Sequence, residues 1–447
     1  MDLDSFFVSV ECLKNSQFKG KPLIIGGTSR RGVVASCSYE ARRYGVHSAM
    51  PIKMALSLCP DAIVLRGDMD SYSRHSKLVT EVIAEDAPAY EKASIDEFYL
   101  DLTGMDKHFG CYTWSKELRQ RIIRETGLPI SCGLSLNKLV SKVGTGEAKP
   151  NGAIEIPMGT EKQFLSPLSV KKIPGIGKQT YKKLSFMGVR KIKVLSEIPV
   201  RLLEREFGEN GRKLWEKSQG IDRSPVVPYS EQKSMSKERT FTEDTLDLRY
   251  MRNMLLKMVD ELAFELRSKD RLTSCVAVKL RHADFNTFTK QRRIPYTANE
   301  AVISRHILEL FDSLNDRRQL IRLIGVKFSG LVGGNYQISI FDDTAKAISL
   351  MERKDHIRKR FGTDKIMRAS YMDQKKGREW WIMNEELWIV GMWFKVYGLG
   401  ILNDDFWMMI FGMWLTDFWM MNWEGNDELW MKNYEFWGWA YIPLIVY

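Results

Sequence analysis

The sequence lacks the cysteine and histidine patterns that hold metals or staple small secreted domains. Its six cysteines and six histidines are scattered, and no cysteine belongs to a CxxC or CxxH pair. A zinc site and a disulfide framework are therefore not expected, and the free thiols fit a reducing, cytoplasmic environment.

Long apolar runs are missing as well. No stretch reaches the ~18 to 20 uninterrupted apolar residues that a bilayer-spanning helix needs, and no signal peptide precedes the first motif, which starts at Asp2. We therefore expect no membrane partner. The chain of 447 residues should form several domains, because a domain usually has about 100 to 200 residues.

Acidic charge is not in excess before residue 371. The whole chain has a formal net charge of +11, but residues 371–447 contain 5 Lys+Arg against 11 Asp+Glu, so residues 1–370 carry +17. Such an excess of positive charge predicts a polyanionic partner such as nucleic acid, although it also serves solubility.

Two adjacent acidic residues stand out because they interrupt an apolar run. Asp96 and Glu97 lie within Ala93–Thr103, which otherwise has the composition of a buried strand, and charges inside a strand usually need a partner or a metal. Neighbouring side chains of a strand point to opposite faces, so both carboxylates can serve one site only where the strand turns or bulges. A pair of exposed turn carboxylates is the alternative.

A second run, Met1–Glu11, places Asp2 in a short strand that passes into a helix. Carboxylates from two strands can hold two divalent cations, and such a pair suits phosphoryl or nucleotidyl transfer. We therefore expect one site that joins Asp2 to Asp96 and Glu97. An Asp-x-Asp motif alone is weak evidence, because glycosyltransferases and phosphatases also use one.

Together, these two runs resemble the palm motifs of the Y-family translesion DNA polymerases, of the DNA polymerase IV (DinB) type. The resemblance covers about residues 1–370, and its specificity comes from several motifs in the family's order and spacing. The further motifs are Ser38–Val46, Gly133–Lys138, Ala148–Gly152 and Ile173–Gly177.

The resemblance implies a multidomain α/β (α+β) fold of the right-hand polymerase type. It implies a ferredoxin-like palm, small fingers, a helical thumb with a helix-hairpin-helix, and a little finger with a ββαβ-type arrangement. The expected divisions are palm 1–10 and 66–157, fingers 11–65, thumb 158–228, linker 229–237, little finger 238–336, clamp motif and terminal helix 337–370, and tail 371–447.

The implied activity is low-fidelity, translesion DNA synthesis by a DNA-directed DNA polymerase that uses primer-template DNA and deoxynucleoside triphosphates. Asp2, Asp96 and Glu97 are the expected catalytic residues, and they would hold two Mg²⁺ ions per active site. The resemblance places the nucleotide against Phe7, Ser36, Tyr39, Arg42 and Lys149.

Each nucleotide contact has a physical reason beside a plainer alternative. Tyr39 and Arg42 are three residues apart, so on a helix they share a face and could grip one triphosphate; an exposed arginine is otherwise simply solvated. Lys149 has a compact charge suited to phosphate, although a lysine beside a turn is ordinarily a surface residue. By resemblance, Phe7 stands at the position whose ring excludes a 2′-hydroxyl.

The expected DNA contacts lie in the thumb and the little finger. A hairpin with glycines lets the backbone approach phosphate closely and offers free N–H groups at the next helix, which positions a duplex without reading its sequence. A tight turn and a basic solvent face are the alternatives. The expected residues are Gly175, Gly177 and Lys178 in the thumb and Lys279, Arg281, Lys290 and Arg292 in the little finger.

Gln337–Phe341 resembles the peptide by which bacterial polymerases bind their sliding clamp. Gln337 with Ile340 and Phe341 would fill one groove of the clamp, although an edge strand would look alike. The resemblance also implies that the protein acts as a monomer.

One departure from the family bears on activity. Family members have several residues of apolar strand before the first aspartate, whereas here Asp2 lies next to the α-amino group. A shortened strand would lose ladder hydrogen bonds, and a nearby ammonium could compete with metal. A catalytically impaired protein that binds DNA or the clamp is therefore one alternative. A palm-type nucleotide cyclase is another, but a cyclase would need neither the thumb hairpin nor the basic region after it.

The tail differs from the rest of the chain. Residues 371–447 hold 11 of the 13 tryptophans and contain quasi-repeats such as Asp405–Met409 and Asp417–Met421. A membrane-surface or aromatic binding segment is one interpretation. We favour a reading frame that runs past its natural stop, and we expect a non-native or disordered segment with an aggregation liability.

Overall fold

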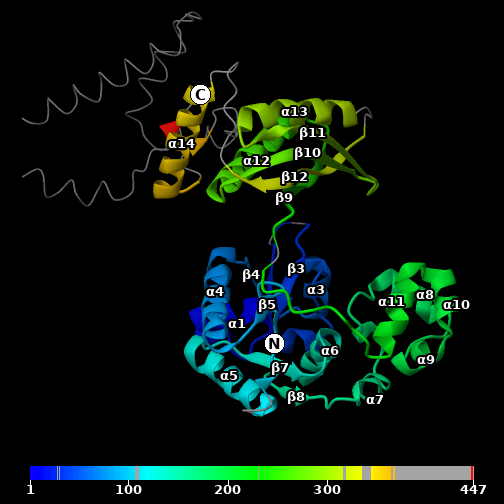
Figure 1. The fold of residues 1–447 in the computed structure, drawn as a ribbon. Coiled ribbons are helices and arrows are strands. Elements are labelled where there is room, and N and C mark those ends of the chain that lie inside the picture. The colour runs from blue at the N-terminus through cyan, green and yellow to red at the C-terminus, as the bar shows by residue number, and fades with distance from the viewer. Residues whose placement is uncertain are drawn as a thin grey trace, which may run out of the picture. The chain divides into compact units, whose positions relative to one another are not determined.

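The computed structural model describes residues 1–27, 29, 31–105, 110–229, 231–315, 319–334, 344–363, 366–367 and 444–445 (Figure 1). The chain forms two compact units, Met1–Glu231 and Gln232–Tyr447. The predicted clamp residues Gln337, Ile340 and Phe341 lie outside the described residues, as does the tail apart from Leu444–Ile445.

The predicted palm, in the first unit, contains five short strands. They are β1 (Asp2–Leu3), β5 (Tyr90–Lys92), β6 (Phe98–Leu100), β7 (Ile130–Leu134) and β8 (Ala153–Glu155). β1, β7 and β8 form a mixed sheet in that order, with β1 antiparallel and β8 parallel to β7. β5 and β6 form an antiparallel hairpin, which a bridge between Asp2 and Glu97 joins to β1.

Four helices accompany these strands: α1 (Phe6–Lys14), α4 (Met69–Asp86), α5 (Cys111–Thr126) and α6 (Lys138–Ala148). Asp68 caps α4 by accepting from Ser71 N–H, and Asn137 caps α6 by accepting from Val140 N–H, as short polar side chains do at helix N-termini. Apolar side chains of the sheet and the helices fill one core, including Leu3, Phe6, Tyr72, Phe98 and Ile130.

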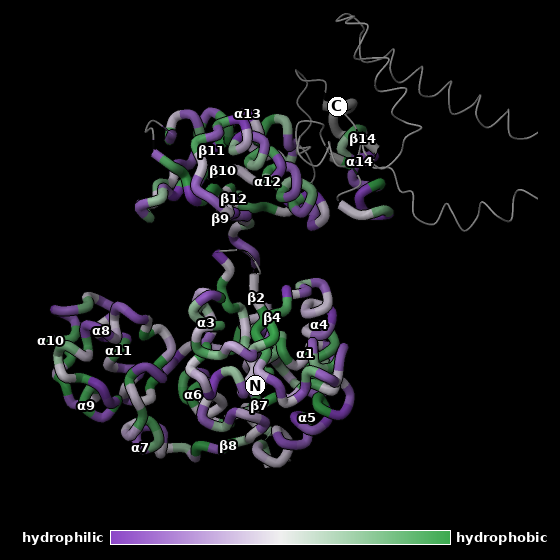
Figure 2. The backbone as a smooth tube through the Cα atoms, turned by 180° about the vertical axis from the view of Figure 1, so that it is seen from behind, coloured by the Kyte–Doolittle hydropathy of each residue, from purple (hydrophilic) through white to green (hydrophobic). Residues whose placement is uncertain are grey.

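The predicted fingers form a second three-stranded sheet in the strand order β3-β2-β4. Its elements are β2 (Leu23–Gly26), β3 (Val34–Cys37), α2 (Tyr39–Arg43), α3 (Ile52–Leu58) and β4 (Ile63–Leu65), preceded by the 3₁₀ turn η1 (Ser16–Phe18). Figure 2 shows that β2 and β4 are mainly hydrophobic, and the central strand β2 is buried along its whole length, as expected for a strand covered on both faces.

The predicted thumb is helical, as expected. Its elements are α7 (Glu161–Leu165), the 3₁₀ turn η3 (Val170–Lys172), α8 (Lys178–Phe186), α9 (Ile192–Glu197), α10 (Val200–Phe207) and α11 (Glu209–Ser218). α10 and α11 pack so closely that a Cβ on Gly211 would lie 2.0 Å from the Leu203 carbonyl oxygen. Leu165, Leu184 and Leu195 are fully buried in the thumb core.

The second unit is an antiparallel sheet with the strand order β11-β10-β12-β9. In chain order its elements are β9 (Ser234–Thr245), α12 (Leu248–Ser268), β10 (Arg271–His282), β11 (Thr287–Thr297), α13 (Glu300–Leu314) and β12 (Ile321–Gly333). The order is therefore βαββαβ, whereas the resemblance implied a ββαβ-type arrangement. The connecting segment is also shorter than the predicted 229–237, because β9 begins at Ser234.

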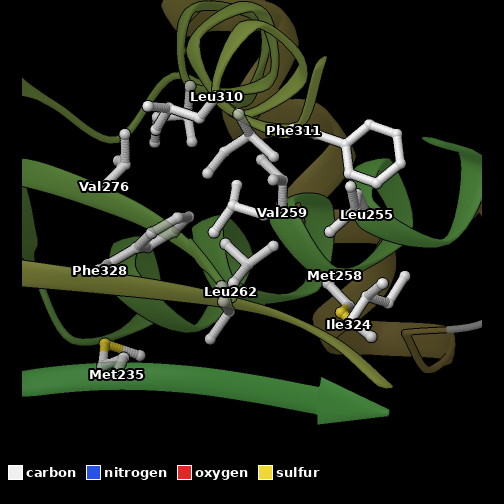
Figure 3. Packing of buried hydrophobic residues seen from close by; sticks show 14 of the residues in the cluster. Met235, Leu255, Met258, Val259, Leu262, Val276, Leu310, Phe311, Ile324 and Phe328 are labelled. Atoms are coloured by element: carbon white, nitrogen blue, oxygen red, sulfur yellow. The ribbon is translucent and has the colours of Figure 1, made fainter. Parts of the chain in front are cut away.

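The core of the second unit lies between the sheet and its two helices. Figure 3 shows Val259 and Leu262 of α12 near the strand residue Phe328, and Leu255 beside Phe311 of α13. A further helix, α14 (Thr344–Phe361), precedes β13 (Ile366–Met367), which pairs with β14 (Leu444–Ile445).

The structure confirms the mixed α/β architecture but corrects one local expectation. The segment Ser94–Asp96 is the turn between β5 and β6 rather than part of one buried strand. Asp96 and Glu97 can therefore serve one site, because the chain turns there instead of continuing as a regular strand. Among the described residues, no helix is both long and apolar enough to cross a membrane.

Candidate active site

Backbone pairing brings the three predicted catalytic carboxylates to one edge of the palm. Leu3 N–H donates to the Asp96 carbonyl at 3.0 Å, and Phe98 N–H donates to the Met1 carbonyl at 3.0 Å. The Met1 ammonium in turn donates to the Phe98 carbonyl at 2.8 Å. These bonds lie on both sides of the bridge between Asp2 and Glu97. The two-residue strand β1 is thus held by the hairpin as well as by β7.

Each of the three carboxylates has a hydrogen-bond donor beside it. Lys142 Nζ donates to both Glu97 oxygens, at 2.7 and 2.6 Å, and Lys149 Nζ donates to Asp2 Oδ1. Ser94 Oγ donates to Asp96 Oδ1 at 2.6 Å. Lys142 and Lys149 both come from α6 and its C-terminal end, so this helix supplies two positive charges to the site.

Within the described part of the chain, no three His, Cys, Asp or Glu side chains are grouped as a metal site. The donor set nevertheless fits a hard divalent cation, because it consists of carboxylate oxygens. Asp2 and Glu97 each pair with a lysine ammonium in this structure, so each of them already stabilises a positive charge.

Burial and neighbouring charges shift the pKa values of several groups in the site. Burial raises the pKa of Asp2, and Glu97 and Asp96 add to this, while Lys149 opposes it. Burial also lowers the pKa of the Met1 ammonium. For Lys142, burial works to lower the pKa, but pairing with Glu97 outweighs burial and the pKa is raised. A cation is therefore favoured beside these carboxylates.

The predicted steric residue Phe7 is held by a second aromatic ring. Its ring stacks on Tyr72, with centroids 4.3 Å apart and planes inclined by 11°. Tyr72 is fully buried, and its hydroxyl donates to Glu11 Oε1 at 2.8 Å; burial and this bond raise the pKa of Tyr72. Phe7 therefore has a fixed plane rather than a free rotamer.

Tyr39 and Arg42 share one face of α2, as predicted. The Arg42 guanidinium carbon lies 4.9 Å from the centroid of the Tyr39 ring. Tyr39 Oη donates to Asp4 Oδ1 at 3.4 Å, and burial, together with the charge of Asp4, raises the pKa of Tyr39 to about 12. Ser36 lies in β3, opposite Ile25.

Lys149 and Tyr39 meet at the same carboxylate. Lys149 Nζ lies 3.6 Å from Asp4 Oδ1 and donates to the Leu3 carbonyl at 3.0 Å. A cavity of about 370 Å³ opens beside Tyr39, and its lining includes Asp4, Tyr39 and Asn151 but neither Lys149 nor the three predicted catalytic carboxylates. Residues from α1, α2 and the turn after α6 therefore face one hollow, whose size is in the range of small-molecule pockets.

Sequence reasoning missed two residues of this site. Asp4 is buried. Only Asp2 is assigned a role from the sequence, although both residues belong to the same Asp-x-Asp motif. Lys142 carried no signal except its position four residues after Lys138 on a helix. Their partners, Ser131 and Glu97, are distant in sequence, so tertiary structure was needed to identify them.

The thumb hairpin has the predicted open backbone and an additional brace. Gly175 has φ of +96°, a conformation that favours glycine, and α8 begins after Gly177 without a side-chain cap. Lys217 from α11 donates to the Pro174 carbonyl at 2.7 Å. A lysine ammonium thus lies directly beneath the hairpin.

The structure divides the four basic residues predicted in the little finger. Val278 and Leu280 are fully buried, so Lys279 and Arg281, which alternate with them, lie on the other face of β10. Lys290 and Arg292 pair directly with Val278 and Val276 and therefore lie on the helix-covered face.

Arg292 is correspondingly paired with Glu309 of α13. Arg293, which pairs with Cys275, is the exposed basic residue of β11 on the same face as Lys279 and Arg281. The four predicted residues therefore do not share one face.

Comparison with known proteins identifies the class. Residues 1–146 match the impB/mucB/samB family, residues 232–340 match the C-terminal domain of that family, and residues 171–222 match the thumb domain of DNA polymerase-iota. The matched segments contain the thumb hairpin, the little finger and the predicted palm up to residue 146. The fold and the matched segments thus place the chain among DNA polymerases, a class of nucleotidyltransferase.

Similar proteins define the family more closely. A DNA polymerase IV of Dehalococcoides mccartyi (strain BAV1) is 36% identical over 370 residues, which cover 82% of this chain and 95% of the relative. A DNA polymerase IV of Treponema denticola is 35% identical over 328 residues, covering 73% and 83%. The chain belongs to the Y-family DNA polymerases, of the DNA polymerase IV type, and it is a DNA-directed DNA polymerase. The resemblance found in the motifs is confirmed.

Solved structures agree with this assignment. A Y-family DNA polymerase chimera has a TM-score of 0.66 at 28% identity, covering 74% of this chain and 98% of the chimera. DinB from Sulfolobus solfataricus has a TM-score of 0.53 at 27% identity, with the same coverage. Y-family polymerases depend on metal ions for activity.

Proposed function

We propose that this polymerase extends a DNA primer by two-metal nucleotidyl transfer and tolerates damaged templates with low fidelity. The observation that supports this most directly is the bridge between Asp2 and Glu97, with Asp96 in the adjoining turn. Asp2, Asp96 and Glu97 would hold two Mg²⁺ ions. When bound, the ions would stabilise the negative charge on the attacking oxygen of the primer and on the departing pyrophosphate.

The chain's own residues would bind and orient the nucleotide. Lys149 and Arg42 carry the charges, and Tyr39 the hydroxyl, that can hold a triphosphate. Lys149 is paired with Asp2 here, so an arriving triphosphate would offer it a new anionic partner. The stacked ring of Phe7 would lie against the sugar and exclude ribonucleotides, and Ser36 would complete the nucleotide site.

Primer-template DNA is the proposed second substrate. One of the similar solved structures is an insertion ternary complex of a polymerase from this family, and residues 1–370 carry the charge of +17 that suits a polyanion. Gly175, Gly177 and Lys178 would contact the duplex backbone from the thumb. Lys279 and Arg281 would supply charge from the face of the little finger opposite the helices, and Lys290 and Arg292 would contribute less from the other face.

Three further proposals rest on the family alone. Gln337, Ile340 and Phe341 would bind a sliding clamp, the protein would act as a monomer, and it would work in the cytoplasm.

The test is single-nucleotide primer extension with Mg²⁺, on undamaged and abasic templates. Asp96→Ala should reduce incorporation by at least about 10³-fold, because removing a metal ligand removes transition-state stabilisation. Duplex affinity should change less than about twofold, because Asp96 belongs to neither the thumb nor the little finger. Equal loss of binding and chemistry would contradict the assigned role. A wild-type chain that binds DNA but never extends the primer would favour the non-catalytic alternative.

A further inference from the structure

The turn that carries Lys149 is held by two buried charges of opposite sign. Asp4 is 1% exposed and Arg119 is 8% exposed. Both contact Asn151, the residue that follows the Lys149-Pro150 pair. Burying a charged side chain costs free energy unless hydrogen bonds or an opposite charge compensate for it. Asp4 and Arg119 must therefore each be held by several contacts.

The acidic side of this arrangement is rigid. Asp4 Oδ2 accepts the backbone N–H of Asn151 at 2.6 Å. The hydroxyl of Ser131, which is fully buried in β7, donates to both Asp4 oxygens at 3.0 and 2.9 Å. Charge-assisted bonds of this length fix orientation strongly. Asp4 thereby ties the turn to the central strand.

The basic side contacts the same residue from α5. Arg119 Nη2 donates to the Asn151 carbonyl at 2.5 Å and also to the Asn151 side-chain oxygen. Arg119 Nε donates to the Ile130 carbonyl at 2.8 Å. Asn151 has a φ of +51°, which asparagine tolerates better than most residues, and it presents both of its oxygens to one guanidinium.

Asp4 also lies near the functional end of Lys149. The Lys149 ammonium is 3.6 Å from Asp4 Oδ1, while the backbone two residues later is bonded to Asp4 Oδ2. The same carboxylate therefore contacts the turn and faces the charge that the turn carries. A displaced turn would move the ammonium relative to Asp2 and Leu3.

We propose that Asp4, Arg119 and Asn151 are positioning residues that set the Lys149 ammonium for the triphosphate. The inference rests on the proposed nucleotide role of Lys149. None of the three residues is required to touch the nucleotide. Their function is to hold one cation in register with the catalytic carboxylates.

The experiment compares kcat and KM for a single correct deoxynucleotide in full-length variants. Lys149→Ala should raise KM about 10- to 100-fold, the range for losing a charged hydrogen bond. Arg119→Lys cannot hold the Ile130 carbonyl and Asn151 at the same time, as the guanidinium does through Nε and Nη2. This variant should raise KM about tenfold, with kcat changed less than about threefold. Asn151→Gly keeps the positive φ and the backbone contacts and should raise KM only about threefold.

The decisive readout is the double variant. In the Lys149→Ala background, Arg119→Lys should change KM less than about twofold, because the charge that it positions is gone. Arg121→Ala is the control on the same helix, since Arg121 pairs with Glu85, Asp86 and Glu125 instead; its KM should match wild type. Thermal unfolding of each variant reports stability separately.

The outcomes separate the two proposals. If Lys149→Ala leaves KM unchanged, the nucleotide role of Lys149 fails. If Lys149→Ala raises KM while Arg119→Lys and Asn151→Gly lower only the unfolding temperature, the nucleotide role stands and the positioning inference is overturned. Full additivity of Arg119→Lys with Lys149→Ala would also overturn it.

Discussion

Single residues in this polymerase act through fixed contacts rather than through their identity alone. Phe7 is an aromatic residue among many in the sequence, yet its plane is set by Tyr72, and Tyr72 is set by Glu11. Nothing in the local sequence distinguishes Lys142 and Lys149 from surface lysines, yet each is paired with a predicted metal ligand. Chemistry at this scale depends on neighbours that come from other elements.

Phe7 provides the clearest test at this scale. Phe7→Ala should raise ribonucleotide incorporation at least about 100-fold relative to deoxynucleotide, because the ring that would clash with a 2′-hydroxyl is removed. Phe6→Leu is the matched control, since Phe6 is buried in the core and should not alter sugar selection. The ratio of kcat/KM for the two sugars measures the effect. An unchanged ratio in Phe7→Ala would place the sugar elsewhere.

Whole elements decide which charges can reach DNA. The thumb hairpin is open at Gly175 and braced by Lys217, whereas the little-finger sheet presents its two faces differently because one is covered by α12 and α13 (Figure 3). Charge on an element is therefore useful only on the side that is left uncovered.

Lys217 should contribute to duplex affinity through its charge at the hairpin. Lys217→Met should reduce the dependence of log affinity on log salt by about one unit of slope, as expected when one lysine no longer neutralises a phosphate. Lys213→Met is the control, because Lys213 lies on the same helix and is solvent-exposed. Fluorescence anisotropy on a labelled primer-template at several salt concentrations measures the slope. Weaker binding with an unchanged slope would indicate a purely structural brace.

The two faces of β10 and β11 give a second test at this scale. Alanine at Lys279, Arg281 or Arg293 should each weaken duplex binding by about two- to fivefold, because these side chains share the face opposite the helices. Alanine at Lys290 should have a smaller effect, since Lys290 lies on the helix-covered face. The same anisotropy assay ranks the four variants. A dominant effect of Lys290 would reverse this assignment.

At the scale of the molecule, each unit has its own core, and the second unit adds a buried charge network. Asp260 of α12 pairs with Lys354 and Arg358 of α14, and Arg267 pairs with Glu300 and Asp355. Burial alone would raise the pKa of Asp260, but the two cations outweigh burial and hold the pKa below its usual range. The same balance lowers the pKa of Glu300.

This network predicts a loss of stability in acid. A carboxylate whose pKa is lower when folded stabilises the fold above its unfolded pKa of about 4, and that stability is lost as pH falls through the folded value. The free energy of unfolding from urea titrations should therefore fall below about pH 4. Asp260→Asn should cost about 3 to 5 kcal/mol at neutral pH, because it leaves Arg358 buried without its anion. The difference between Asp260→Asn and wild type should shrink in acid, and a constant difference would show that Asp260 does not titrate with folding.

The sequence by itself determined the family, the fold class and the order of most elements. Several motifs keep a family-like spacing, and hydrophobic periodicity marks most helices and strands because it is local. Tertiary structure decided what depends on pairing between distant segments. It placed Asp96 in a turn, joined Asp2 to Glu97 through a backbone bridge, and divided the basic residues of β10 and β11 by register. It also brought Asp4 and Arg119 to Asn151, an arrangement that no local pattern could show, because it forms only when α5 and the central sheet pack together.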